Sequence, residues 1–296
     1  MVLTIASRGS ALALWQAHHV RDRLEAAHDA LTVHVRVVQT TGDRVTDVPL
    51  AAIGDRGLFT KEVDRLLLEG DADLAVHSLK DLPTRTEPGL AIAAVTERED
   101  PRDVVVFRPG APPSIDDLEP GARVGTSSLR RRAQLLARRP DLVVDDLRGN
   151  LDTRLRRVAE GDYDAVILAA AGIRRLDRAD EIGQWLEPPG WLPAVGQGAL
   201  GIAARADDEP TRSLLAVLDH PPTRAATTAE RAFLNELEGG CQVPIGALAE
   251  VTFDALALHG LVASLDGATV LRGNADGGID RADHLGRLLA AELRER

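Results

Sequence analysis

Arginine recurs beside hydroxyl or small residues at three places where a strand is expected to end and a helix to begin. A helix start offers free backbone N–H groups to an anion, and a guanidinium holds a carboxylate or phosphate through two parallel hydrogen bonds. A serine or threonine at one such place is by itself an ordinary cap. Three of them in one chain favour a ligand with several negative charges. They are Ser7-Arg8-Gly9-Ser10, Thr126-Ser127-Ser128-Leu129-Arg130-Arg131-Arg132, and Arg148-Gly149-Asn150 with Arg154.

A carboxylate and a thiol are the other candidates for chemistry. Asp81 follows an expected strand and precedes Pro83 by two positions. It is either a turn residue or a carboxylate that stabilises a cation or handles protons. Cys241 lies in a loop with Gly239 and Gly240 before it. It is either an inert small side chain or a nucleophilic or covalently modified thiol, with His77 as the nearest candidate partner by motif.

Composition excludes several classes of protein. The chain has 296 residues and a formal net charge of −11, which argues against a general nucleic-acid binder. All of its 35 basic residues except Lys61 and Lys80 are arginines, and aromatic residues make up only 3%. A single cysteine excludes an internal disulfide framework. We find no apolar run of transmembrane length and no signal-peptide pattern, so we expect a cytoplasmic protein.

Alternating strand and helix patterns occupy the first two thirds of the chain and predict an α/β fold with largely parallel sheets. The pattern restarts after residue 120, which indicates two similar lobes. Ser10 and Thr60 are expected to cap helices. Strands are expected at residues 2–6, 31–38, 74–76, 122–125, 142–147, 164–171 and 192–204, and helices at 11–27, 60–69, 126–139 and from 151.

The last third of the chain changes character. A helix pattern over residues 227–237 is followed by strand patterns at 247–253, 255–263 and 268–272, with Asp266-Gly267 as a hairpin turn. An amphipathic helix is expected at 283–294. Strands followed by a helix predict a small α+β domain at residues 221–296.

These segments together resemble the porphobilinogen deaminase (hydroxymethylbilane synthase) family over residues 2–250. Eight motifs in order carry the resemblance. They are Ser7-Arg8-Gly9-Ser10 with Leu12-Ala13-Leu14-Trp15-Gln16, Gly57-Leu58-Phe59-Thr60-Lys61-Glu62, Ala75-Val76-His77-Ser78-Leu79-Lys80-Asp81-Leu82-Pro83, Glu99-Asp100-Pro101-Arg102-Asp103, Val124-Gly125-Thr126-Ser127-Ser128-Leu129-Arg130-Arg131, Leu147-Arg148-Gly149-Asn150, Ala194-Val195-Gly196-Gln197-Gly198-Ala199-Leu200-Gly201 and Leu237-Glu238-Gly239-Gly240-Cys241.

The resemblance implies a fold and a reaction. Two lobes like those of periplasmic binding proteins would span residues 1–97 with 198–216, and 98–197, before the C-terminal domain. The family is a transferase that joins four porphobilinogen molecules head to tail, with loss of ammonia. The primer is dipyrromethane, a cofactor held by a thioether to the cysteine that matches Cys241. Water then releases hydroxymethylbilane, a precursor of haem and other tetrapyrroles.

The resemblance also assigns roles to residues. Asp81 would be catalytic, stabilising the positive charge of the azafulvene left when ammonia departs. The pyrrole carboxylates would explain an arginine-lined cleft. No metal is expected. Besides Cys241, cofactor binding is expected of Ser78, Lys80, Asp81, Thr126, Ser128, Arg130, Arg131 and Arg148, and substrate binding of Arg8, Ser10, Gln16, Arg154, Arg175 and Gln197.

Two other functions compete with this interpretation. A non-catalytic, two-lobed anion-binding receptor module would explain the lobes and the arginines, but it would not need Asp81, Cys241 or a third domain. A cysteine hydrolase would use Cys241 with His77. Under the favoured interpretation we expect a monomer whose partner is the small molecule porphobilinogen, with no nucleic-acid or membrane partner.

Overall fold

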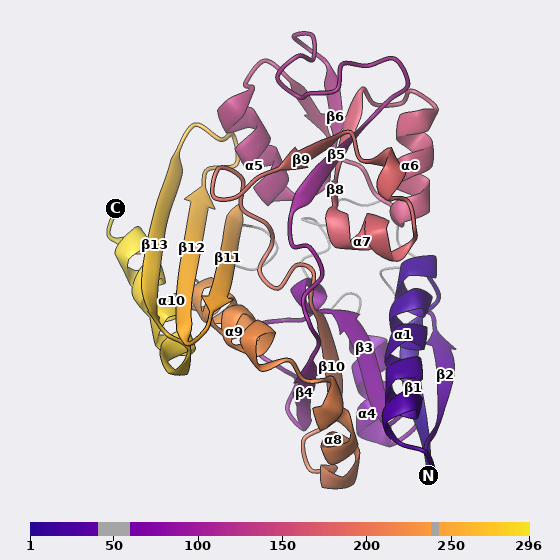
Figure 1. The fold of residues 1–296 in the computed structure, drawn as a ribbon. Coiled ribbons are helices and arrows are strands. Elements are labelled where there is room, and N and C mark those ends of the chain that lie inside the picture. Colours follow the sequence, from indigo (N-terminus) through magenta and orange to yellow (C-terminus); the bar gives the residue numbers. More distant parts are fainter. Residues whose placement is uncertain (41–59, 238–242) are drawn as a thin grey trace. The chain divides into compact units, whose positions relative to one another are not determined.

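The computed structural model describes residues 1–40, 60–237 and 243–296, which form two compact units (Figure 1). The first unit contains residues 1–40, 60–99 and 198–224, and the second contains 100–197, 225–237 and 243–296. None of the helices in these residues combines the length and apolar composition needed to cross a bilayer.

A five-stranded sheet forms the centre of the first unit. Its strand order is β2-β1-β3-β10-β4, in which β1 is parallel to β2 and β3, whereas β10 is antiparallel to both its neighbours. The elements are β1 (Val2–Arg8), α1 (Ala11–Ala27), β2 (Thr32–Val38), α4 (Lys61–Glu69), β3 (Leu74–Ser78), the 3-10 turn η1 (Leu79–Asp81), β4 (Leu90–Val95), β10 (Leu200–Arg205) and α8 (Glu209–Leu215).

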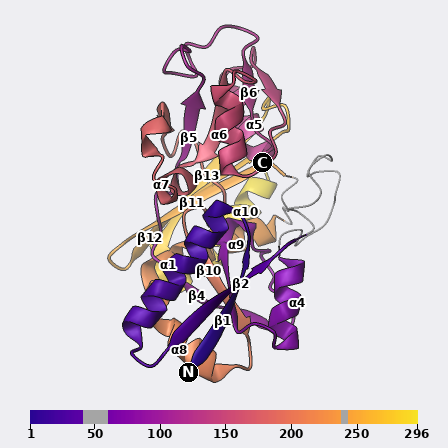
Figure 2. The ribbon, with the colours of Figure 1, turned by 90° about the vertical axis from the view of Figure 1, so that its right-hand side faces the viewer.

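Helices α1 and α4 cover opposite faces of this sheet (Figure 2). Successive side chains of a strand point to opposite faces, so Ile5 packs in the cluster that contains α1, whereas Ala6 packs in the cluster that contains α4. Burial on both faces explains why the middle of β1 carries apolar residues on both of its faces, such as Ile5 and Ala6. The sheet edge from which α1 starts is thereby held between two packed layers.

The second unit repeats this arrangement in its own sheet, β7-β6-β8-β5-β9. Strand β6 is parallel to β7 and β8, whereas β5 is antiparallel to β8 and β9. Helices α5 and α6 contribute to different apolar clusters of this sheet. The elements are β5 (Asp103–Phe107), β6 (Arg123–Gly125), α5 (Leu129–Arg138), β7 (Val143–Asp145), α6 (Leu151–Ala159), β8 (Ala165–Ala169), α7 (Ala170–Arg175) and β9 (Gln184–Leu186).

A three-stranded antiparallel sheet follows helix α9 (Pro221–Glu236). Its strands are β11 (Ile245–Thr252), β12 (Ala255–Ala263) and β13 (Val270–Gly278), and α10 (Ala282–Arg294) ends the chain. Helices α9 and α10 share one apolar cluster with this sheet. A Cβ at Gly286 would lie 2.2 Å from the carbonyl oxygen of Ala229, so the two helices approach too closely there for a larger residue.

The predicted α/β class and the C-terminal α+β segment are confirmed, with corrections. Each five-stranded sheet is mixed and not largely parallel. Thr60 precedes α4 but makes no side-chain cap hydrogen bond, whereas Ser10 accepts one from the backbone N–H of Ala13. The expected strand at 164–171 ends at Ala169, and helix α7 begins at the next residue, Ala170. Strands β4, β5 and β9 and helix α8 had no counterpart in the prediction.

Strand β10 returns the chain to the first unit, as the Gly-rich segment predicted, but it begins only at Leu200. Gly198 just before it has φ +93°, and a Cβ there would lie 2.2 Å from the carbonyl oxygen of Glu99. Only glycine tolerates both the left-handed backbone and this close approach. The chain divides into two compact units, whereas three domains were predicted. The predicted domain boundaries at residues 97, 197 and 221 therefore stay a prediction.

Candidate functional site

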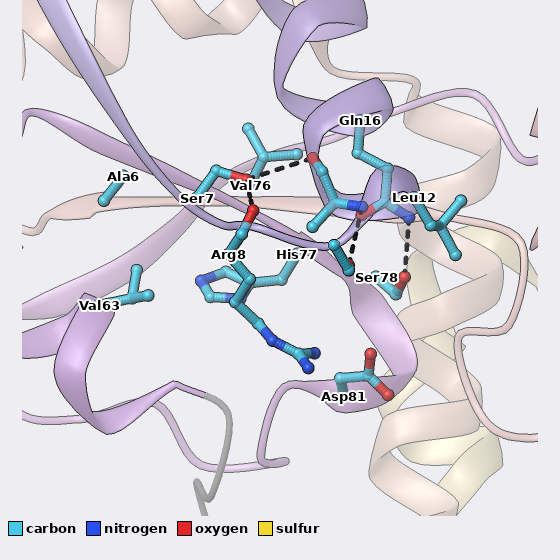
Figure 3. Close-up of a pocket in the computed structure, with 12 residues that line it drawn as sticks. Ala6, Ser7, Arg8, Leu12, Gln16, Val63, Val76, His77, Ser78 and Asp81 are labelled. Carbon is cyan, nitrogen blue, oxygen red and sulfur yellow. Dashed lines mark hydrogen bonds between the residues drawn. The ribbon is translucent and has the colours of Figure 1, made fainter. Parts of the chain in front are cut away.

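A pocket in the first unit lies where β1 and β3 end. It is lined by residues of β1, α1, α4, β3 and η1, among them Arg8 and Asp81 (Figure 3). Strands β1 and β3 are parallel neighbours, so their carboxyl ends meet at one edge of the sheet. Ligands of open α/β sheets bind beyond that edge. The pocket therefore brings together residues that are about 70 positions apart in the sequence.

Hydrogen bonds fix the wall that α1 contributes. Ser10 caps the helix through its contact with the N–H of Ala13, at 3.3 Å. One helical turn further on, the Gln16 side chain is buried, and its Nε2 donates to Oγ of Ser78 at 3.0 Å. Five residues from which the sequence predicted ligand contacts line this one pocket, namely Arg8, Ser10, Gln16, Ser78 and Asp81.

Asp81 combines a place in this pocket with an exposed side chain. Its carboxylate makes no hydrogen bond or ion pair with the residues that the structure describes. Figure 3 shows the Arg8 guanidinium and the Asp81 carboxylate directed into the same space. Lys80 is half-buried in η1 and is not among the residues that line the pocket. The pocket can thus present a cation and an anion to one polar ligand.

His77 also lines this pocket and is buried, with 7% of its surface exposed. Its Nε2 has no hydrogen-bond partner among the described residues. Burial lowers the pKa of His77 to about 4, and the positive charge of Arg8 makes a smaller contribution in the same direction. The imidazole is therefore uncharged near neutral pH, and it cannot act there as a cationic partner for a thiolate.

We expect this buried imidazole to make folding stability depend on pH. In the unfolded chain it titrates near 6.5, so below that pH the unfolded state binds the additional proton. The free energy of unfolding should fall by roughly 3 kcal/mol as pH drops from 6.5 through 4. Denaturant unfolding of wild type and His77→Gln across this range measures the effect. The free energy of unfolding of His77→Gln should fall less steeply as the pH drops. His34→Gln, a control at an exposed site, should show the same pH dependence as wild type. Equal slopes for all three proteins would contradict the assignment.

The second unit gathers its candidate residues at the matching edge of its own sheet. Strands β6 and β7 are parallel neighbours, and the loops after them are joined by a 2.9 Å hydrogen bond from Ser127 to the carbonyl of Leu147. Ser128 caps α5. Thr126 is buried, and its hydroxyl accepts from the N–H of Ser128 at 3.2 Å.

Arginines follow at the same edge. Arg148 is half-buried in the loop after β7. Arg154, in the first turns of α6, donates from Nε to the carbonyl of Gly149 at 2.9 Å. Arg175 ends α7 and is 8% exposed. The ligand contacts of these three residues stay predictions.

Arg130 and Arg131 are buried, which the sequence did not indicate. Each is 5% exposed, and both donate to the fully buried carboxylate of Asp103, at 2.6 Å from Arg130 and at 2.7 and 3.1 Å from Arg131. Gln197 is also buried and donates to Asp103 at 2.8 Å. Three residues from which the sequence predicted ligand contacts therefore share one internal partner.

Asp103 is the residue that sequence reasoning missed. It belongs to the motif Glu99-Asp100-Pro101-Arg102-Asp103, but no role was assigned to it. Burial alone would raise the pKa of Asp103, but the guanidinium groups of Arg130 and Arg131 outweigh it and hold that pKa well below the usual value. A carboxylate directly before the apolar run of β5 was the available signal, because a buried charge requires a partner.

Cys241 lies outside the described residues, so its distance from Asp81 stays a prediction. Within residues 1–40, 60–237 and 243–296, no three His, Cys, Asp or Glu side chains are grouped so that they could hold a metal ion.

Comparisons with known proteins identify the family. The model described as "Porphobilinogen deaminase, dipyromethane cofactor binding domain" matches residues 3–213, and the one described as "Porphobilinogen deaminase, C-terminal domain" matches 225–295. The porphobilinogen deaminase of Roseiflexus castenholzii is 53% identical over 291 residues, which cover 98% of this chain and 95% of that protein. The porphobilinogen deaminase of Chromobacterium violaceum is 52% identical, with 98% and 94% covered.

Among solved structures, the periplasmic VFT2 domain of Bordetella pertussis BvgS is similar at 18% identity and a TM-score of 0.46, covering 73% of this chain and 86% of that one. No function follows from so distant a likeness. The matches to the two family models together span almost the whole sequence, and the two relatives match it at more than half of the aligned positions. The chain therefore belongs to the porphobilinogen deaminase family.

Proposed function

We propose that this chain condenses four porphobilinogen molecules on a dipyrromethane primer bound to Cys241 and releases hydroxymethylbilane. The near full-length family match carries this proposal, because it covers both the cofactor-binding domain and the C-terminal domain. As a member of the family, the chain is a transferase of tetrapyrrole biosynthesis that acts on porphobilinogen and uses dipyrromethane. The receptor-module interpretation is not favoured.

Asp81 and Arg8 fit the bond changes of each condensation step. A C–N bond of porphobilinogen breaks, ammonia leaves, a C–C bond forms to the pyrrole that ends the chain, and that carbon loses a proton. When bound, dipyrromethane supplies the first pyrrole carbon that is extended. Positive charge develops on the substrate as ammonia leaves, and the Asp81 carboxylate, which has no ion-pair partner among the described residues, is available to stabilise it. Arg8, in the same pocket, would hold an acetate or propionate group.

The donors of the second unit fit a primer that carries carboxylates. Both contacts of the Arg130 guanidinium within the described residues, to Asp103 and to the carbonyl of Leu192, come from Nη1. Its Nε–Nη2 edge has no partner there, and that edge has the geometry for a bidentate carboxylate contact. We therefore assign primer binding to Arg130. On the family resemblance we assign it also to Cys241, to Thr126, Ser128, Arg131 and Arg148, and to Ser78, Lys80 and Asp81 of the first unit. We assign binding of the incoming substrate to Arg8, Ser10, Gln16, Arg154, Arg175 and Gln197.

The proposal extends to organisation and location. We infer three domains, at residues 1–97 with 198–216, 98–197 and 221–296, with the cofactor cysteine in the last. Three separate sheets with their own helices support this division. We also infer a monomer that works in the cytoplasm without a nucleic-acid or membrane partner. The net charge of −11 and the single cysteine support that inference.

Intact-protein mass spectrometry tests the function. Protein purified from cells should be heavier than its sequence by two linked pyrrole units. Brief mixing with porphobilinogen should add further species, each heavier by one more unit, up to four. A bare sequence mass that porphobilinogen does not change would contradict the proposal and favour a binding module. Rapid alkylation of Cys241 in the purified protein would instead favour a cysteine hydrolase, because a thioether resists alkylation.

A further inference from the structure

Asp103 is the centre of a buried cluster in the second unit. It is fully buried, and its two carboxylate oxygens accept from Arg130, Arg131, Trp191 and Gln197. The Trp191 contact, from indole Nε1, is 2.9 Å long. Charge-assisted hydrogen bonds of this kind are short and strongly directional. The cluster therefore fixes the orientation of both guanidinium groups.

The sheet topology places Asp103 at the edge where the candidate ligand residues lie. Strand β5 is antiparallel to β8, and Asp103 at its start is paired with Ala169 at the end of β8. The carboxyl end of the parallel strand β6 leads into Thr126 and α5, whose first turn carries Arg130 and Arg131. A carboxylate at the start of an antiparallel strand thus reaches guanidiniums at the start of a helix.

The two arginines are held differently. Asp103 engages Arg131 along its Nε–Nη2 edge, and Nη1 of Arg131 donates to the carbonyl of Ile167 at 2.8 Å. Arg130 is held by Nη1 alone. A Cβ on Gly246 would lie 3.2 Å from Cδ of Arg130, so the start of β11 packs against the stem of that side chain. Arg130 is thereby confined on one side and keeps its Nε–Nη2 edge for a ligand.

We propose that Asp103 is a positioning residue that locks Arg131 into the fold and turns the Nε–Nη2 edge of Arg130 toward a carboxylate of the pyrrole primer. This inference rests on the proposed function and adds a division of labour to it. Arg131 chiefly holds the cluster in place, whereas Arg130 binds a carboxylate of the primer. Gln197 and Trp191 complete the shell around the carboxylate, so that a single orientation of both guanidiniums is stable.

Primer loading, compared at matched stability, tests the role of Asp103. Asp103→Asn removes the charge that orients both arginines. Val158→Ala is the control, because Val158 is buried on helix α6 and its apolar cluster contains none of the residues that bond to Asp103. Both variants should lower the Tm. In the folded fraction, Asp103→Asn should carry at least fivefold less primer by intact mass, and Val158→Ala should be loaded like wild type. Equal loading of the two variants would overturn the positioning role.

A second variant keeps the test decisive if Asp103→Asn does not fold. Arg130→Gln leaves Asp103 with Arg131, Trp191 and Gln197, so we expect a smaller loss of Tm than in Arg131→Gln, together with loss of most of the primer. Arg130→Gln protein with full primer would overturn the assignment of Arg130. Wild-type protein without any primer would instead contradict the proposed function, so the two failures are distinguishable.

Discussion

Asp81→Asn should lower kcat for tetrapyrrole formation by roughly 10³-fold or more, while the primer stays attached. The substitution keeps the shape of the side chain but removes the negative charge. Asp81 lines the pocket with Arg8 and makes no hydrogen bond or ion pair within the described residues, so that charge is available to a cation that forms in the pocket. Product formation from porphobilinogen measures the rate, and intact mass measures the primer.

The matched control is Asp22→Asn, which changes an exposed aspartate of the same unit whose one ion-pair partner in the described part of the chain is its neighbour Arg21. This variant should keep the wild-type kcat. Near-normal turnover of Asp81→Asn would refute the catalytic role assigned to Asp81. Loss of the primer in that variant would show that Asp81 is required already for assembly of the primer.

Cys241→Ser should give protein without an attached primer and without measurable product. A serine hydroxyl is a far weaker nucleophile than a thiolate at neutral pH, and the chain has no second cysteine to replace it. Intact mass should equal that of the bare sequence, both before and after addition of porphobilinogen. The expected loss is complete, which makes this the largest effect among the variants.

Val243→Ser is the control for that substitution, because it places a hydroxyl two positions away at a side chain that is 40% exposed. It should keep the primer and most of the turnover. Primer found on purified Cys241→Ser protein would disprove the thioether link, whatever the activity of the control.

Local sequence signals were sufficient for much of the fold. The period-3.6 pattern and the Ser10 cap predicted α1 over the residues it occupies, 11–27. Signals failed where the structure depends on distant partners. Strand β4 was not predicted, and its hydrogen-bonding neighbour β10 lies more than 100 residues further along the chain. Thr60 precedes a helix as predicted, but its side chain makes no cap hydrogen bond.

The candidate site shows the same difference between features set by local sequence and features set by distant partners. Arg8 and Asp81 could be assigned to one pocket, because each follows a recognisable strand and parallel strands end at one edge. The burial of Arg130 and Arg131 could not be predicted, since arginines on a helix usually face solvent. Their partner Asp103 is almost 30 positions away, at the start of the antiparallel strand β5, whose apolar run the prediction did not assign to a strand. A charge pair across such a distance is visible only after the sheet order is known.

Strand β10 has a consequence for biosynthesis of the chain. It hydrogen-bonds to β3 on one side and to β4 on the other, yet it follows them by more than 100 residues. While the ribosome adds residues 100–197, both strands therefore expose an unpaired edge, which is a hazard for aggregation. All five strands of the sheet in the second unit lie between residues 103 and 186. The last strand of the amino-terminal sheet is therefore synthesised after all five strands of the sheet in the second unit.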